Sequence, residues 1–117
     1  MEGDRILMTV LLVAGHKEWV AQCLEYDLAA QGPSIEEACR SFERVLMGQL
    51  MLDGMKMRRP LDGIGQAPAG WRDLLRQAKP VNGPCQLGRP PFKPSAMFEF
   101  KTYAVAEAAG EQTRRRA

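Results

Sequence analysis

The chain has 117 residues, of which 45% are hydrophobic and 26% are charged, and this size and composition suit one globular domain. The formal net charge of +2 is close to neutral, so the average charge favours no particular class of partner. The apolar run from Ile6 to Ala14 is too short to span a bilayer, and the acidic residues Glu2 and Asp4 argue against a signal peptide.

The sequence contains an odd number of cysteines and no closely spaced pair among them: Cys23, Cys39 and Cys85. Secreted domains of this size usually carry many cysteines in an even number, so we expect reduced thiols and a cytoplasmic protein. Together with the single histidine, His16, these residues do not offer the close ligand pairs of a structural zinc site. We therefore expect neither a metal nor another cofactor.

The first part of the sequence predicts three strands. Residues 5–14 are apolar on both alternating faces, which is typical of an interior strand covered on both sides. A turn at Gly15 separates this run from the extended segment 18–24, so the two predict an antiparallel hairpin. Residues 28–31 predict a short third strand that ends at Gly32-Pro33.

A long helix follows. In the capping box Ser34-Ile35-Glu36-Glu37, the Ser34 hydroxyl can accept the Glu37 amide, and the Glu37 carboxylate can reach back to the Ser34 amide. We expect the helix to end at Asp53-Gly54, with Gly54 as the left-handed residue. Apolar residues at steps of three and four define its buried face: Ile35, Ala38, Phe42, Val45, Leu46 and Leu50.

The remaining chain predicts a shorter helix from Pro68 to Pro80, a Pro-rich connector, and a half-buried strand at residues 97–105. That strand is a candidate sheet edge, and an open edge either needs protection or recruits another strand. The predicted fold class is α+β: a three-stranded antiparallel-rich sheet, a long helix, a shorter helix and a C-terminal strand (β-β-β-α-α-β), with the helices on one face. Residues 1–105 form the expected domain, and residues 106–117 are expected to be a disordered basic tail.

Two segments carry a family resemblance: Trp19 to Asp27, and Ala30 to Ala38 with its Gln-Gly turn, Ser cap and Glu-Glu-Ala helix start. They resemble the HicB-like antitoxin family over residues 5–52. The resemblance implies a β-β-β-α-β core, described as a partial ribonuclease H-like fold. It also implies that the protein binds and neutralises HicA, a small basic toxin that cleaves messenger RNA. The DNA-binding domain that many members carry at the C-terminus has no counterpart after Gly54.

No arrangement of residues predicts catalysis. His16 lies in a predicted turn, and Cys23 is expected to point into the core, so the two do not suggest a Cys-His dyad. A metal-dependent nuclease needs several converging carboxylates, and only Glu25 and Asp27 lie near a predicted strand end. We therefore expect a protein that is not an enzyme.

Protein binding is the function that we expect, by steric masking of a small partner, from a protein that is itself a homodimer. The candidate partner-binding residues are Tyr26, Asp27, Trp71, Phe98 and Phe100. Met47, Met51, Met55 and Met57 cluster near the end of the long helix, where they either fill gaps in the core or form an interface.

A nucleic-acid-binding protein is the alternative. Two basic clusters could contact phosphates: Lys56, Arg58 and Arg59 after the long helix, and Arg114, Arg115 and Arg116 in the tail. Exposed basic loops most often only solvate a surface, and no element suited to reading DNA bases is evident.

Overall fold

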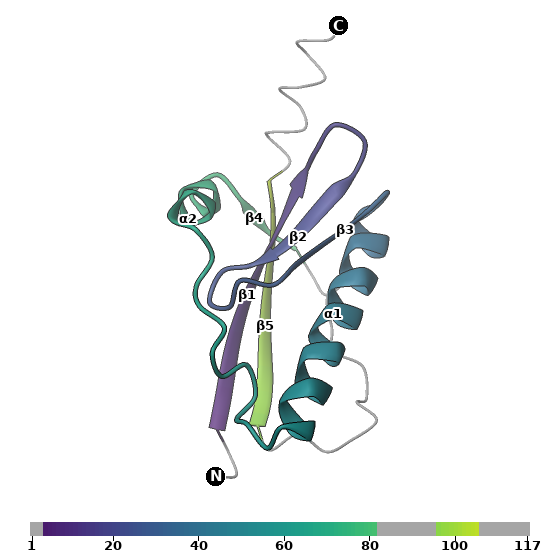
Figure 1. Ribbon diagram of the computed structural model, residues 1–117. Helices are drawn as coiled ribbons and strands as arrows, with labels where there is room; N and C mark the ends of the chain where they lie inside the picture. Colours follow the sequence, from purple (N-terminus) through teal and green to yellow (C-terminus); the bar gives the residue numbers. More distant parts are fainter. Residues whose placement is uncertain (1–3, 82–95, 106–117) are drawn as a thin grey trace, which may run out of the picture.

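A five-stranded mixed sheet and two helices make up the computed structural model, which describes residues 4–81 and 96–105 (Figure 1). The strands are β1 (Asp4–Ala14), β2 (Trp19–Cys23), β3 (Ala29–Gly32), β4 (Lys79–Pro80) and β5 (Ala96–Val105). The helices are α1 (Ile35–Met55) and α2 (Ala69–Leu75). The fold is therefore α+β, as predicted, but its chain order is β-β-β-α-α-β-β, because the short strand β4 was not predicted.

The centre of the sheet is β1. The strand order is β3-β2-β1-β5-β4. The predicted hairpin of β1 and β2 is confirmed, with Val10 opposite Cys23 and Ala14 opposite Trp19. On its other side, β1 pairs with β5 in parallel over ten residue pairs. The longest pairing is thus parallel, so the sheet is mixed and the antiparallel-rich expectation holds only for the other three pairings.

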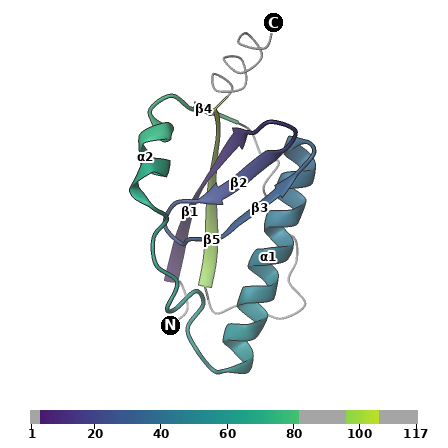
Figure 2. The same cartoon turned by 45° about the horizontal axis from the view of Figure 1, so that its top comes forward.

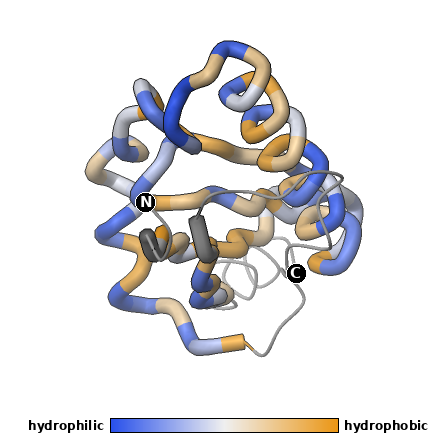
Figure 3. Tube along the Cα trace, turned by 90° about the horizontal axis from the view of Figure 1, so that it is seen from below, coloured by the Kyte–Doolittle hydropathy of each residue, from blue (hydrophilic) through white to orange (hydrophobic). Residues whose placement is uncertain are grey.

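Each face of the sheet carries one helix. Met8, Val10 and Leu12 of β1 share a buried cluster with α1. α2 lies on the other side of the sheet (Figures 1 and 2), so the expectation that both helices share one face is wrong. Leu11 of β1 and Val105 of β5 are completely buried outside the α1 cluster, as expected for a central strand covered on both faces. Hydrophobic and hydrophilic residues interleave along much of the described trace (Figure 3).

The start of α1 shows why the Gly-Pro-Ser segment precedes it. The Ser34 hydroxyl accepts a hydrogen bond from the Glu37 amide at 3.1 Å, which confirms the predicted cap. The Glu37 carboxylate forms an ion pair with Arg40. A Cβ on Gly32 would lie 2.6 Å from the Ala38 backbone nitrogen, so the last residue of β3 must be a glycine for α1 to pack this closely.

The end of α1 differs from the expectation. Gly54 lies inside the helix, which continues to Met55 and is capped by Lys56. The residue with a left-handed backbone is Met57, with φ 57°, and Leu61 also has a positive φ of 63°. The predicted role of Gly54 as the left-handed residue is therefore wrong.

In the second half of the chain, the second helix is shorter than predicted and a short strand follows it. The second helix ends at Leu75, and Lys79–Pro80 form β4, where Pro80 was expected to close the helix. β5 pairs within this chain and lies between β1 and β4, so it is not the last strand of the sheet. β4 covers only Tyr103 and Ala104 of β5. The predicted tail 106–117 and most of the Pro-rich connector lie outside the described residues.

Two glycines should respond to alanine in opposite directions. Gly32→Ala should lower the free energy of unfolding by about 2 kcal/mol, because the new methyl group would collide with backbone atoms of α1. Gly48→Ala should raise it by about 0.5–1 kcal/mol, since Gly48 lies within α1 and its added Cβ meets nothing within 4 Å.

Urea denaturation of the two variants, followed by circular dichroism, measures both changes. Each variant serves as the control for the other, because the substitution is the same. Equal effects of the same sign would contradict the close approach of β3 to α1.

Candidate partner-binding surface

The solvent-facing side of α1 has a charged first half. Glu37 and Arg40 form an ion pair of 3.2 Å, and both side chains remain largely exposed. One turn later, the Arg44 guanidinium donates a hydrogen bond to the Ser41 hydroxyl at 3.2 Å. This half of the helix presents the solvated face that is usual for an amphipathic helix.

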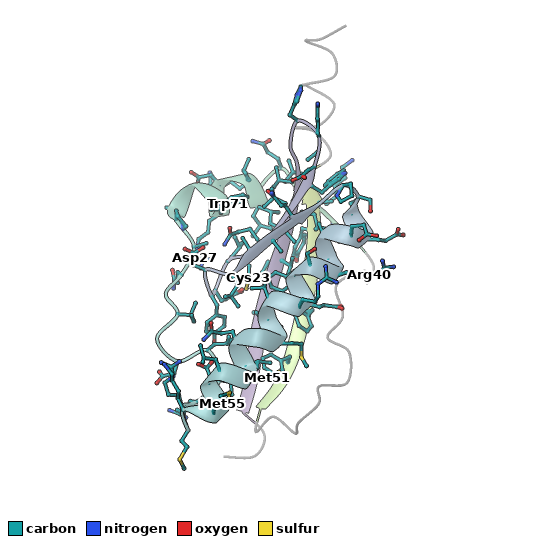
Figure 4. The ribbon with its side chains drawn as sticks, turned by 45° about the vertical axis from the view of Figure 1, so that its right-hand side comes forward. Cys23, Asp27, Arg40, Met51, Met55 and Trp71 are labelled. Carbon is teal, nitrogen blue, oxygen red and sulfur yellow. The ribbon has the colours of Figure 1, made fainter. Side chains whose placement is uncertain are left out.

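The second half of the same helix is apolar where it faces solvent. Five of the six exposed large hydrophobic residues in the described chain lie between residues 45 and 57. Met51 and Met55 are one turn apart, and Figure 4 shows both on the outside of α1. We call this set the α1 apolar surface, with the exposed fractions of its members being Val45 40%, Met51 45%, Leu52 40%, Met55 78% and Met57 93%.

The methionines that cluster near the end of α1 differ in their burial. Met47 is half-buried, whereas Met51, Met55 and Met57 are exposed. Of the two interpretations that the sequence left open, filling of core gaps is excluded for these three residues. Their flexible, polarisable side chains are suited to contact with another molecule.

A buried carboxylate holds the loop that follows the apolar surface. Asp53 is 1% exposed and accepts a hydrogen bond of 2.7 Å from the Leu61 amide. Its other oxygen accepts from the Gln49 side chain and from the Arg58 guanidinium, each at 3.1 Å. A buried carboxylate is stable only when it is paired and hydrogen-bonded, as here. Sequence reasoning placed Asp53 at a helix end and missed this role.

The basic cluster after α1 is only partly available to a ligand. Lys56, Arg58 and Arg59 are all exposed, but the Arg58 guanidinium is bound to Asp53. Arg58 therefore holds the loop in place, a role that was not predicted. The second predicted phosphate-binding cluster, Arg114 to Arg116, lies outside the described residues.

Three of the predicted partner-binding residues lie on one side of the fold. Tyr26 and Asp27 form the turn between β2 and β3, and the Asp27 amide donates to the Gly65 carbonyl at 2.7 Å. The Gln22 side chain donates to the Asp27 carboxylate at 2.9 Å. Figure 4 shows Trp71 of α2 on the same side of the molecule as Asp27. Asp27 is exposed, whereas Tyr26 and Trp71 are half-buried.

The other two predicted residues belong largely to the interior. Phe98 and Phe100 of β5 pair with Ile6 and Met8 of β1 and pack against the cluster beneath α1. Their rings stack with centroids 6.4 Å apart. Both are half-buried, so their main role is in the core of the protein.

The described residues contain no grouped metal ligands. Within residues 4–81 and 96–105, no three side chains of His, Cys, Asp or Glu lie close enough together to hold a metal ion. His16 is exposed in the turn between β1 and β2. Glu25, a carboxylate considered for metal binding, instead accepts the Thr9 amide and hydroxyl, both at 2.7 Å.

The two described cysteines are in different states. Cys23 is a free thiol in the core, and desolvation by burial is the main cause that raises its pKa from 9.0 to about 11. A thiol of this pKa is protonated at neutral pH and is a poor nucleophile. Cys39 of α1 is buried and disulfide-bonded, so the expectation of a reduced thiol is wrong for this residue.

No protein-family model, curated protein or solved structure matches this chain. Neither described helix is long and apolar enough to cross a membrane.

The Asp53 carboxylate should be needed for stability. Asp53→Ala leaves the Leu61 amide and the Arg58 guanidinium without their acceptor, so the free energy of unfolding should fall by about 2 kcal/mol. Asp62→Ala is the matched control, because Asp62 is exposed in the same loop. Urea denaturation measures both, and equal losses would contradict the role assigned to Asp53.

Cys23 should resist alkylation while the protein is folded. Mass spectrometry of the peptide containing Cys23 should show slow labelling by iodoacetamide at pH 8 and rapid labelling in urea, because the folded pKa is about 11. Since the folded pKa is raised, the thiol's contribution to stability is complete below pH 9 and is lost as the pH rises towards 11. Labelling of the folded chain as fast as free glutathione would contradict this environment.

Proposed function

We propose that this chain is a non-catalytic protein-binding module that regulates or neutralises a small partner protein by covering it. The observation that carries the proposal is the α1 apolar surface, where five large hydrophobic side chains are exposed within thirteen consecutive residues. Single exposed hydrophobic residues are normal on a protein surface, but a concentrated group usually marks a contact with another molecule.

The antitoxin form of the proposal rests on the sequence resemblance. The residues that resemble HicB-like antitoxins, Trp19 to Asp27 and Ala30 to Ala38, span β2, the following turn, β3 and the start of α1. In the fold, three strands precede α1, and the later strand β5 lies beside β1. This arrangement is compatible with the β-β-β-α-β core that the resemblance implies. A small HicA-like toxin is accordingly the first partner to test, and the homodimer stays a prediction.

Nucleic-acid binding is the second candidate function, and the exposed basic residues Lys56, Arg58 and Arg59 favour it. The ion pair between Arg58 and Asp53 weakens this alternative, because it occupies one of the three cations. The two functions differ in their response to salt. Phosphate contacts weaken steeply as salt is added, whereas a packed protein interface weakens much less.

A nuclease-treated pull-down from the native cytoplasm tests the proposal. The wild-type chain should retain a protein partner through a high-salt wash, and Met51→Glu with Met55→Glu should lose most of it. Two exposed charges at these positions should disrupt an apolar contact while leaving the core untouched, since both side chains face solvent.

Gln77→Glu is the control, because Gln77 is exposed just after α2, away from the apolar surface. Circular dichroism should show that all three proteins are folded. Recovery of nucleic acid alone, released by salt, would replace the proposal with the alternative.

A further inference from the structure

We propose that residues 68–78, which include α2, open as a unit while the rest of the protein stays folded, and so uncover part of the sheet. We call these residues the α2 strap. The inference goes beyond the proposed function and depends on no partner. Three observations support it: the low burial of α2, the backbone contacts that fix both ends of the strap, and the buried apolar residues on the side of the sheet where α2 lies.

α2 is packed less tightly than α1. None of its seven residues is buried, whereas six residues of α1 are. Its large apolar residues Trp71, Leu74 and Leu75 form one stripe, and each is only half-buried. A helix of this length is unstable without packing. Among the described residues, no side chain caps its start at Pro68, and Gly70 in its first turn lowers helix propensity. Opening α2 therefore costs little compared with unfolding the whole protein.

Both ends of the strap are fixed to the rest of the fold. Before it, Ala67 is buried, and its amide donates to the Leu24 carbonyl at 3.1 Å. After it, the Val81 amide donates to the Thr102 carbonyl at 2.8 Å, and Val81 packs against the cluster beneath α1. The pairing of β4 with β5 adds to this second anchor. The opening is therefore confined to the residues between the two anchors.

The opening uncovers apolar residues of the sheet. Val10 and Leu12 of β1 belong to the cluster beneath α1, so Leu11 between them faces the other side, where α2 lies (Figure 2). Tyr103 is the neighbour of Leu11 on β5, and Val105, two residues further on, faces the same side. Leu11 and Val105 are completely buried, and α2 contacts β5. The strap thus controls access to a second apolar surface, separate from the α1 apolar surface.

Amide hydrogen exchange of the full-length chain, followed by NMR, tests this proposal. The amides of Trp71, Gln77 and Ala78 report on the strap, because each donates to a carbonyl within it. They should exchange about a hundredfold or more faster than the Phe42 amide of α1. Small additions of urea should leave their rates unchanged, since a local opening exposes little surface.

The two anchors should behave differently from the strap. The amides of Ala67 and Val81 should exchange at least about tenfold more slowly than the strap amides. Equal exchange of anchors and strap would overturn the proposal, because the opening would then extend beyond residues 68–78.

Two glycine-to-alanine variants separate local opening from global unfolding. Gly70→Ala should slow exchange of all three strap amides by about two- to fivefold, because its Cβ meets nothing within 4 Å and favours the closed helix. Gly48→Ala, the matched control in α1, should slow exchange of Phe42 and leave the strap unchanged. Equal slowing of strap and Phe42 by Gly48→Ala would mean that α2 opens only in global unfolding. That result, or an effect of Gly70→Ala at Trp71 alone, would refute the proposal.

Binding of the dye ANS tests the surface that the opening uncovers. Leu74→Ala with Leu75→Ala should favour the open strap, because it removes two of the three large apolar side chains of α2. The pair is made in the Met51→Glu, Met55→Glu background, which reduces dye binding at the α1 apolar surface. ANS fluorescence should rise at least about threefold over that background, with the Phe42 amide still protected. Unchanged fluorescence, or loss of protection at Phe42, would count against the proposal and leave the proposed function standing.

Discussion

The parallel pairing of β1 with β5 constrains the whole fold. β1 has a neighbour on each edge, and Val10, Leu11 and Leu12 are completely buried, so both of its faces must be covered. A parallel neighbour cannot follow through a tight turn, since the chain must first return to the starting end of the sheet. α1 packs on one face of the sheet, and α2 lies on the other side (Figure 2).

Asp53 links that architecture to the outer surface of α1. Its carboxylate faces inward at the end of the helix and takes donors from Gln49, Arg58 and Leu61. The loop after α1 is therefore held against the helix, and Met57 adopts its left-handed backbone there. Asp53 thus determines the path of the loop after α1, with the Arg58 guanidinium as its cationic partner.

Local sequence signals predicted the elements, and distant contacts decided their placement. The Ser34 cap and the hairpin of β1 and β2 could be predicted because both depend on neighbouring residues. The β1–β5 register and strand β4 could not, since they join residues far apart in the chain. The sequence showed that methionines cluster near the end of α1, but it could not tell which of them are buried in the core and which are exposed. Their burial in the folded chain answers that question. Asp53 gave no signal, because an acidic residue near a helix end is commonplace and its three donors meet only in the folded chain.

The two halves of α1 show that folding alone does not explain its sequence. Both halves bury one side in the same core, with Ala38 and Phe42 in the first and Leu46 and Leu50 in the second. Folding requires nothing of the outer side except solubility and helix propensity, which Arg40 and Arg44 satisfy. In the second half, Gly48 lowers helix propensity, and Met55, 78% exposed, adds little to the core. The contact with another molecule proposed above would account for residues that both weaken a helix and expose apolar atoms.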